Sequence, residues 1–136
     1  MKVAAVVGPS GSGKTTLLRE LIAELVAEGH SVAAIKHTHH PLDDRDRGDT
    51  SLLRRAGANP VILAGEGEAI RFEGTQALRF SYGVPADLLL TLDADIVLIE
   101  GFSQIHSWVS IELDATRRVS ATEARRILDR IWQPTS

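Results

Sequence analysis

The sequence predicts a three-layer α/β domain with a mostly parallel β-sheet and a β-hairpin insertion. Two observations support this fold class. Short, continuous apolar runs alternate with segments in which apolar residues recur at helical spacing. The first apolar run also leads through a glycine-rich segment directly into the first helical segment. Strands that alternate with helices are typical of a parallel sheet covered on both faces.

The first half of the chain predicts two strands and two helices. In chain order these are a strand at residues 3–7, a helix at 15–28, a strand at 32–35 and a short helix that begins at Asp49 or Thr50. Gly29 and Gly57 follow the two helices, where C-cap glycines are common. The polar stretch 36–48 predicts a loop between the second strand and the second helix.

The second half continues the alternation after a predicted hairpin. Its elements are hairpin strands at 61–64 and 69–72, a helix from Pro85 to Leu92, strands at 96–99 and within 108–113, and a final helix that starts after Ser120 and ends before Pro134. The Gly-Glu-Gly sequence at 65–67 predicts the hairpin turn. Ser120 and Glu123 have the spacing of a capping box.

Composition limits the classes of function. With 136 residues and no linker-like segment, we expect a single nucleotide-binding domain over residues 1–136. The net charge of −3 provides no basic field, which argues against nucleic acid as a partner. The absence of cysteine excludes disulfides and thiolate metal sites. No apolar run is long enough to span a membrane and no signal peptide is recognisable, so we expect a cytoplasmic protein without a membrane partner.

Residues 8–15, GPSGSGKT, match the phosphate-binding pattern G-x-x-x-x-G-K-[ST] in full. Its glycines let successive backbone N–H groups approach an anion, and the following helix adds the positive end of its dipole. We expect Lys14 to reach the β- and γ-phosphates and the Thr15 hydroxyl to bind Mg²⁺. The sequence therefore predicts a P-loop NTPase domain. Its expected nucleotide-binding residues are Gly8, Pro9, Ser10, Gly11, Ser12, Gly13, Lys14, Thr15 and Thr16.

A P-loop protein also needs a carboxylate near the metal. Asp95 and Glu100 flank the apolar run 96–99, and ligands collect at the carboxyl ends of parallel strands, so we favour Glu100. Asp49 is a further candidate, through a Mg²⁺-bound water. We thus expect Thr15, Asp49 and Glu100 to hold the metal, and Lys14, Asp49 and Glu100 to act on the phosphates.

The polar loop contains three histidines within four residues, His37, His39 and His40. Such a cluster can bind a metal, a phosphate or an anionic group of a partner, although a solvated polar loop is the simpler interpretation. Residues 43–49 alternate in charge, which is typical either of a solvated turn or of a switch segment that orders around the γ-phosphate. Arg47 is one of the arginines there that could face phosphates.

Four segments together resemble the molybdopterin-guanine dinucleotide biosynthesis protein B (MobB) family of small P-loop GTP-binding proteins. They are GPSGSGKTTL at 8–17, AAIKHTHH at 33–40, DTSLLRRAGA at 49–58 and ADIVLIEGF at 94–102. The IKHTHH element is the more specific signal, because few other P-loop families carry it.

The resemblance implies a Mg²⁺-dependent, GTP-preferring homodimer with weak intrinsic hydrolysis. It also implies a role beside the molybdenum cofactor guanylyltransferase, the partner enzyme that joins GMP to molybdopterin. On the family pattern Asp49 and Glu100 lie near the metal, and His37, His39 and His40 line the site. Lys36 and Arg47 are further candidates for contact with a substrate or partner.

The chain departs from the family pattern at three places. Gly48 precedes Asp49 where the family usually has lysine, Ser103 follows the EGF element where it has another lysine, and the last third is shorter. The base preference therefore stays open. Two alternative functions also stay open, a small-molecule kinase with residues 45–55 as a lid and a metal-delivery GTPase that uses the His37–His40 loop.

Overall fold

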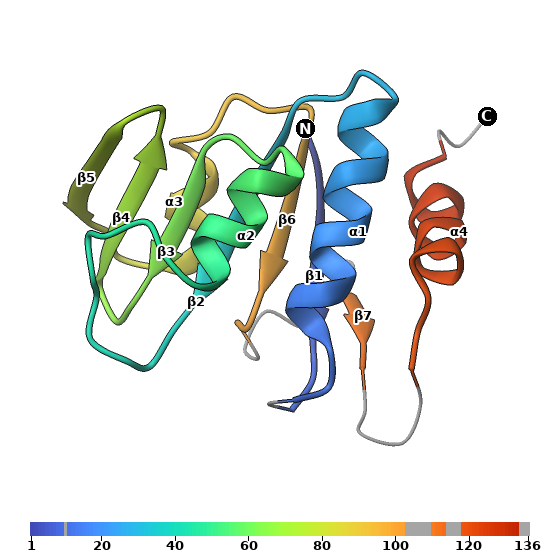
Figure 1. The fold of residues 1–136 in the computed structure, drawn as a ribbon, viewed down its shortest axis with the longest axis horizontal. Helices are drawn as coiled ribbons and strands as arrows, with labels where there is room; N and C mark the ends of the chain where they lie inside the picture. The colour runs from blue at the N-terminus through green and yellow to red at the C-terminus, as the bar shows by residue number, and fades with distance from the viewer. Residues whose placement is uncertain (10, 103–109, 114–117, 134–136) are drawn as a thin grey trace.

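The computed structural model describes residues 1–9, 11–102, 110–113 and 118–133, which form a seven-stranded sheet flanked by helices (Figure 1). The strands are β1 Lys2–Val7, β2 Val32–His37, β3 Val61–Ala64, β4 Glu68–Glu73, β5 Gln76–Ser81, β6 Ile96–Glu100 and β7 Ser110–Glu112. The helices are α1 Lys14–Ala27, α2 Asp49–Ala56, α3 Pro85–Leu89 and α4 Ala121–Trp132.

The strand order is β5-β4-β3-β2-β6-β1-β7. The five strands from β3 to β7 in this order are parallel, whereas β4 and β5 add antiparallel strands at one edge. The chain passes from β1 across β6 to β2, and later from β6 across β1 to β7. These two connections run in opposite directions, so they open a crevice at the carboxyl ends of β1 and β6, where open α/β sheets bind ligands.

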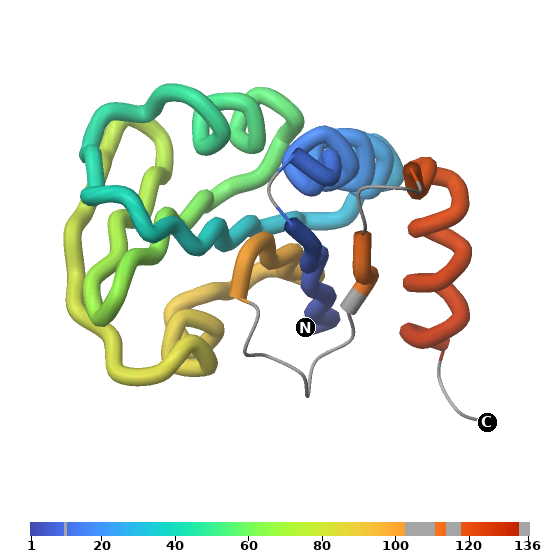
Figure 2. Tube along the Cα trace, turned by 90° about the horizontal axis from the view of Figure 1, so that it is seen from below, coloured from blue at the N-terminus to red at the C-terminus, as the bar shows by residue number. Residues whose placement is uncertain are grey.

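Helices cover both faces of the sheet, and each face has its own apolar core. Figure 2 shows α1 and α2 on one face, α3 on the other, and α4 beyond β7. Helix α1 packs its buried leucines against the first face, together with alternate residues of β1, β2 and β6. Residues of the opposite alternation pack with Leu88 of α3 on the second face. The three-layer α/β prediction is confirmed.

Most predicted elements are present, although the bounds of several differ. The hairpin is confirmed, but a strand that the sequence analysis did not predict, β5, pairs with β4 along its whole length. Residues 78–82, Leu-Arg-Phe-Ser-Tyr, alternate between apolar and polar side chains, which is a strand signal that the prediction did not use. Strand β2 extends to His37, beyond the predicted end at residue 35, α1 begins at Lys14, and α3 ends at Leu89 instead of Leu92.

At the C-terminal end, Ser120 caps α4 as predicted, because its side-chain oxygen accepts a hydrogen bond from the Glu123 N–H. The predicted strand within 108–113 corresponds to β7, and residues 108, 109 and Pro134 lie outside the described residues. Within the part of the chain that the structure describes, no helix combines the length and apolarity that a bilayer crossing requires.

The difference in burial between two leucines predicts that their replacement by alanine changes the free energy of unfolding by different amounts. Leu18 on α1 is completely buried, whereas Leu90 after α3 is 85% exposed. We expect Leu18→Ala to lower the free energy of unfolding by about 2–5 kcal/mol through lost burial and a residual cavity. Leu90→Ala should change it by less than about 0.5 kcal/mol. Urea unfolding followed by circular dichroism checks both, and equal effects would contradict the packing described here.

Candidate functional site

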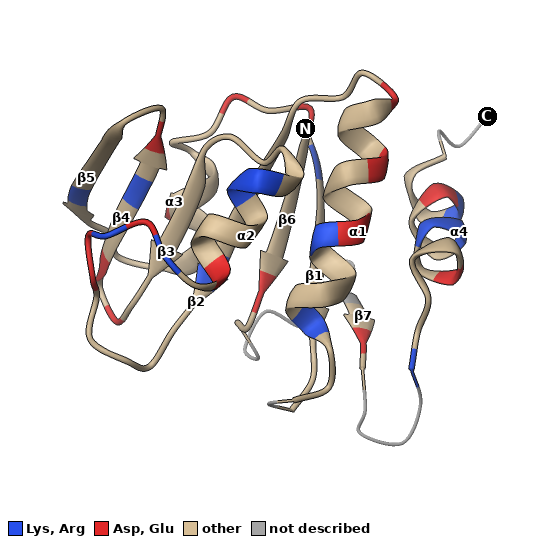
Figure 3. Cartoon of the chain, viewed as in Figure 1, with Lys and Arg blue, Asp and Glu red and all other residues tan. Residues whose placement is uncertain are grey.

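The carboxyl ends of β1, β2 and β6 and the start of α2 meet at one edge of the sheet. In the parallel register, Glu100 on β6 lies between Val6 on β1 and Lys36 on β2. Strand residues alternate between faces, so Glu100 and Lys36 share the face covered by α1 and α2. Figure 3 shows charges of both signs at these element ends. The edge therefore concentrates charge where the glycine-rich loop begins.

Four side chains form a compact cluster there. The Thr15 hydroxyl lies 3.2 Å from Glu100 Oε2 and 3.4 Å from Asp49 Oδ2. Lys36 Nζ hydrogen-bonds to Asp49 and lies 3.3 Å from Glu100 Oε1. Burial alone would lower the pKa of Lys36, but its hydrogen bonds to the two carboxylates and their charges outweigh this effect and raise its pKa. The cluster pairs one ammonium group with two carboxylates, one of which, Glu100, is buried.

The glycine-rich loop is held by contacts within itself and with β7. Lys14 Nζ donates to the Gly8 carbonyl at 2.8 Å, and both the N–H and the hydroxyl of Ser12 donate to Pro9 O. A Cβ at Gly8 would lie 2.5 Å from the Leu113 carbonyl oxygen, so only glycine allows this close approach. The predicted residue Ser10 lies outside the described residues.

A cleft of about 400 Å³ opens between the loop and the four-residue cluster. Its lining brings together most of the site residues that the sequence predicted, namely Gly11, Gly13, Lys14, Thr15, Thr16, Lys36, His37, His39, His40, Asp49 and Glu100. Arg47 is not among the described residues of this lining. It forms an ion pair with Asp43 at 2.6 Å, and its contact with a phosphate, substrate or partner stays a prediction.

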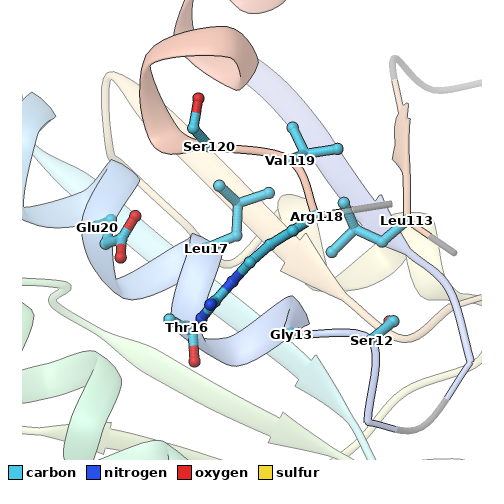
Figure 4. Close-up of a pocket in the computed structure, with 9 residues that line it drawn as sticks. All are labelled: Ser12, Gly13, Thr16, Leu17, Glu20, Leu113, Arg118, Val119 and Ser120. Carbon is cyan, nitrogen blue, oxygen red and sulfur yellow. The ribbon is translucent and has the colours of Figure 1, made fainter. Parts of the chain in front are cut away.

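A second cleft, of about 280 Å³, lies on the other side of the loop (Figure 4). It shares Gly13 and Thr16 with the first cleft, so the two meet at the first turn of α1. Its other lining residues are Ser12, Leu17, Glu20, Leu113, Arg118, Val119 and Ser120. In Figure 4 the Arg118 side chain extends across the opening toward Thr16. The sequence analysis missed Glu20 and Arg118, because neither belongs to a motif.

The three histidines of the polar segment have different surroundings. His37 ends β2 one residue after Lys36 and therefore points to the opposite face of the sheet, where its ring stacks on Phe102 at 4.3 Å. Burial, and then the charge of His39, lowers its pKa, so the neutral imidazole is favoured. His37 and His39 lie beside Glu66 of the hairpin turn. All three histidines line the 400 Å³ cleft, and His37 and His39 in addition lie beside Glu66.

The chain is similar to known proteins in sequence and in fold. The family model "Molybdopterin guanine dinucleotide synthesis protein B" (MobB) matches residues 3–128. A molybdopterin-guanine dinucleotide biosynthesis adapter protein of Haemophilus influenzae is 42% identical over 102 residues, which cover 73% of this chain and 56% of the relative. The protein of the same name from Escherichia coli is 40% identical over 95 residues, which cover 68% and 54%. This chain thus spans about half the length of the curated relatives it matches.

A likeness in fold is seen with the crystal structure of Bacillus subtilis MobB. The TM-score is 0.50 at 20% sequence identity, and the match covers 83% of this chain and 68% of that one. At this identity the likeness extends to the fold alone, and it agrees with the α/β architecture.

The turn after β6 predicts a specific role for Gly101. Its φ is +99°, and a Cβ there would lie 3.1 Å from the His37 carbonyl oxygen. Gly29, after α1, has a similar φ of +95° but open space around a Cβ, so Gly29→Ala isolates the cost of the backbone conformation. We expect Gly29→Ala to cost about 1 kcal/mol and Gly101→Ala about 2–3 kcal/mol in urea unfolding. Equal costs would show that the His37 carbonyl oxygen of β2 does not exclude a side chain at residue 101.

Proposed function

The chain belongs to the MobB family, molybdopterin guanine dinucleotide synthesis protein B, and we propose that it is a GTP-binding adapter that assists the attachment of GMP to molybdopterin. One observation carries the nucleotide part of this proposal. Thr15, Asp49 and Glu100, from three separate elements, converge beside a loop with the full phosphate-binding pattern. The names of the relatives support the pathway.

We propose that the triphosphate occupies the 400 Å³ cleft, with its β- and γ-phosphates over the glycine-rich loop. The backbone N–H groups of the loop and the N-terminus of α1 would bind the phosphate oxygens. The Lys14 ammonium, which here donates to the Gly8 carbonyl, would instead donate to the phosphates as the stronger acceptor. The ligand would thereby replace a contact within the loop by a contact to itself.

The donor set beside Thr15 fits Mg²⁺, because it consists of one hydroxyl and two carboxylates, the hard oxygen ligands that this ion favours. Thr15, Asp49 and Glu100 would hold the ion or its waters, and Mg²⁺ would supply positive charge against the phosphate oxygens. Lys36 now pairs with both carboxylates, so its ammonium group would shift as a divalent cation enters. Lys36 thus balances the charge of Asp49 and Glu100 in the structure.

We expect hydrolysis by this chain alone to be weak. Among the described residues that line the cleft, the cationic side chains are two lysines, and no arginine is present. An arginine that contacts the transferred phosphoryl group, supplied by the same chain or by a partner, typically accelerates hydrolysis by roughly 10³–10⁵-fold. Weak turnover would suit an adapter, in which nucleotide binding matters more than the product.

We propose that the nucleoside enters the cleft of Figure 4. Because this cleft shares Gly13 and Thr16 with the phosphate cleft, a nucleotide can extend from one into the other. Leu17, Leu113 and Val119 would pack against the base, and Arg118 would pair with the phosphate nearest the nucleoside. The Glu20 carboxylate favours guanine, since guanine presents two adjacent N–H donors where adenine presents one donor and one acceptor.

We propose that the chain acts as a homodimer beside the molybdenum cofactor guanylyltransferase, with molybdopterin as the group to be modified. Strand β5 is an outer strand of the sheet, and most of its residues are exposed. Exposed outer strands offer unpaired backbone groups to a second chain. This edge lies away from the nucleotide clefts, so a dimer formed there would leave both clefts accessible to nucleotide and partner.

The nucleotide proposal predicts that calorimetric titration with Mg²⁺ detects GTP binding tighter than ATP binding. We expect Lys14→Ala to weaken GTP binding by roughly 100-fold, because a charged hydrogen bond to phosphate is lost. Chelation of Mg²⁺ should weaken GTP binding by the unmodified chain. Glu100→Gln should remove most of this dependence of GTP binding on Mg²⁺. Glu20→Gln should reduce the preference for GTP over ATP by about 10-fold.

Matched controls exist for these variants. Lys2 and Glu112 lie outside both clefts in the described structure, so Lys2→Ala and Glu112→Gln should bind GTP like the unmodified chain. Undiminished GTP binding by Lys14→Ala would contradict the proposal. A preference for ATP with fast transfer to a small acceptor would favour a kinase.

The adapter proposal predicts that the chain increases the yield of molybdopterin guanine dinucleotide when it is added, with GTP, to the purified guanylyltransferase and molybdopterin. We expect an increase of several-fold with the unmodified chain and with Lys2→Ala, and none with Lys14→Ala. Product chromatography measures the outcome. Equal yields with and without the unmodified chain would contradict the adapter role but leave nucleotide binding intact.

A further inference from the structure

A second cluster of ligand-type side chains lies on the opposite face of the sheet from the Thr15–Lys36–Asp49–Glu100 cluster. His37 comes from the end of β2, His39 from the segment that follows, and Glu66 from the turn between β3 and β4. The alternation of β2 separates the clusters, because Lys36 points toward α1 and α2 while His37 packs with the core on the α3 side. The proposed nucleotide site therefore does not use these three side chains together.

The three side chains present donor atoms to a common point. One donor atom from each residue lies within 4.8 Å of the others. Glu66 Oε1 lies 3.6 Å from His37 Nε2 and 4.0 Å from His39 Nδ1. Zn–N and Zn–O bonds are about 2.0–2.2 Å long. The three donor atoms could therefore share one ion if they moved slightly closer together than their present separations of up to 4.8 Å. Small side-chain rotations of His39 and Glu66, which are 82% and 84% exposed, would suffice.

The backbone that carries these donors is held in place. The stacked Phe102 ring fixes the His37 imidazole. The Thr38 N–H donates to Ala64 O at 2.8 Å, which joins the histidine segment to the end of β3. The hairpin turn that carries Glu66 is tied on both sides, because Gly65 N–H donates to Glu68 O at 2.8 Å and Tyr82 N–H donates to Gly67 O at 2.9 Å. His37 and Glu66 thus lie on backbone that these contacts hold in place, and His39 follows the hydrogen-bonded Thr38 by one residue.

We propose that His37, His39 and Glu66 bind one divalent transition-metal ion of the Zn²⁺ class. Two imidazoles and one carboxylate suit Zn²⁺, Co²⁺ or Ni²⁺, whereas Mg²⁺ prefers oxygen ligands alone. Three protein ligands leave at least one coordination position open, as in sites where zinc binds a further ligand. This metal site does not depend on nucleotide binding, and it is distinct from the proposed Mg²⁺ site.

The open position would face a cavity of about 300 Å³. His37, His39 and Glu66 line this cavity together with Tyr82, Val84 and Phe102. The lining combines the metal-binding side chains with aromatic and apolar surface, which suits a ligand with one donor atom and a flat or apolar body. His37 and His39 also line the phosphate cleft, so a ligand on the metal would lie next to a bound nucleotide.

Zn²⁺ titration of the purified full chain against a chromogenic chelator tests the proposal. We expect one ion per chain, with His39→Ala and Glu66→Gln each weakening affinity at least 10-fold. Both residues are exposed, so these variants should keep the thermal unfolding midpoint of the unmodified chain. Titration with Co²⁺ should give the absorption of a four- or five-coordinate ion, and this absorption should be lost in the same variants.

The controls are His40→Ala, His30→Ala and Lys14→Ala. His40 follows the cluster in sequence but is not part of it, His30 lies at the other end of β2, and Lys14 belongs to the nucleotide site. All three should bind Zn²⁺ like the unmodified chain, and binding retained in Lys14→Ala separates this proposal from the nucleotide one. The metal site is refuted by the absence of stoichiometric binding, by unchanged affinity in Glu66→Gln, or by a loss in His40→Ala equal to that in His39→Ala.

Discussion

The parallel pairing of β1, β6 and β2 is the constraint on which the rest of the structure depends. Strand β6 is buried at every position and hydrogen-bonds to both neighbours, so the three carboxyl ends stop at the same level. The loop after β1, the carboxylate at the end of β6 and the lysine near the end of β2 are neighbours for this reason alone. Strand β6 lies between β1 and β2, so its terminal carboxylate stands between the glycine-rich loop and Lys36.

The carboxylate of Glu100 is buried at this edge of the sheet, so its negative charge must be compensated. A carboxylate with a side chain only 6% exposed requires a nearby cation, and Lys36 supplies it. Asp49, at the start of α2, also pairs with Lys36 and so ties the helix to the sheet edge. The arrangement that keeps Glu100 stable without a ligand is the same arrangement that would offer oxygen donors to an incoming cation. Stability and proposed function therefore draw on one set of side chains.

The side chains of β2 alternate between the two faces of the sheet, so the polar side chains at its end contribute to two different clusters. Lys36 and His37 are adjacent in sequence, yet Lys36 pairs with Asp49 and Glu100 on one face of the sheet, whereas the His37 ring stacks on Phe102 on the other. A shift of β2 by one residue would exchange these side chains and bury an ammonium group in the α3 core. The register is held by pairing with β6 on one side and β3 on the other, which protects both sites together.

Local sequence was sufficient for whatever depends on neighbouring residues in the chain. The apolar periodicities predicted the core strands and helices, and the strand–loop–helix arrangement predicted around residues 8–15 is present, while phosphate binding there stays a prediction. Glu100 lies at the carboxyl end of β6, as its place after an apolar run indicated, whereas Asp95 accepts a hydrogen bond from the Ser31 N–H at the far end of the sheet. Tertiary structure decided whatever depends on distant segments meeting. The alternation of residues 78–82 is a local strand signal, but the antiparallel pairing of β5 with β4 at the edge of the sheet belongs to the tertiary structure. Glu66 joins His37 and His39, and Arg118 reaches the first turn of α1, only because strand order and crossovers bring these segments together. No local pattern encodes such encounters, because they arise from the register of strands far apart in the chain.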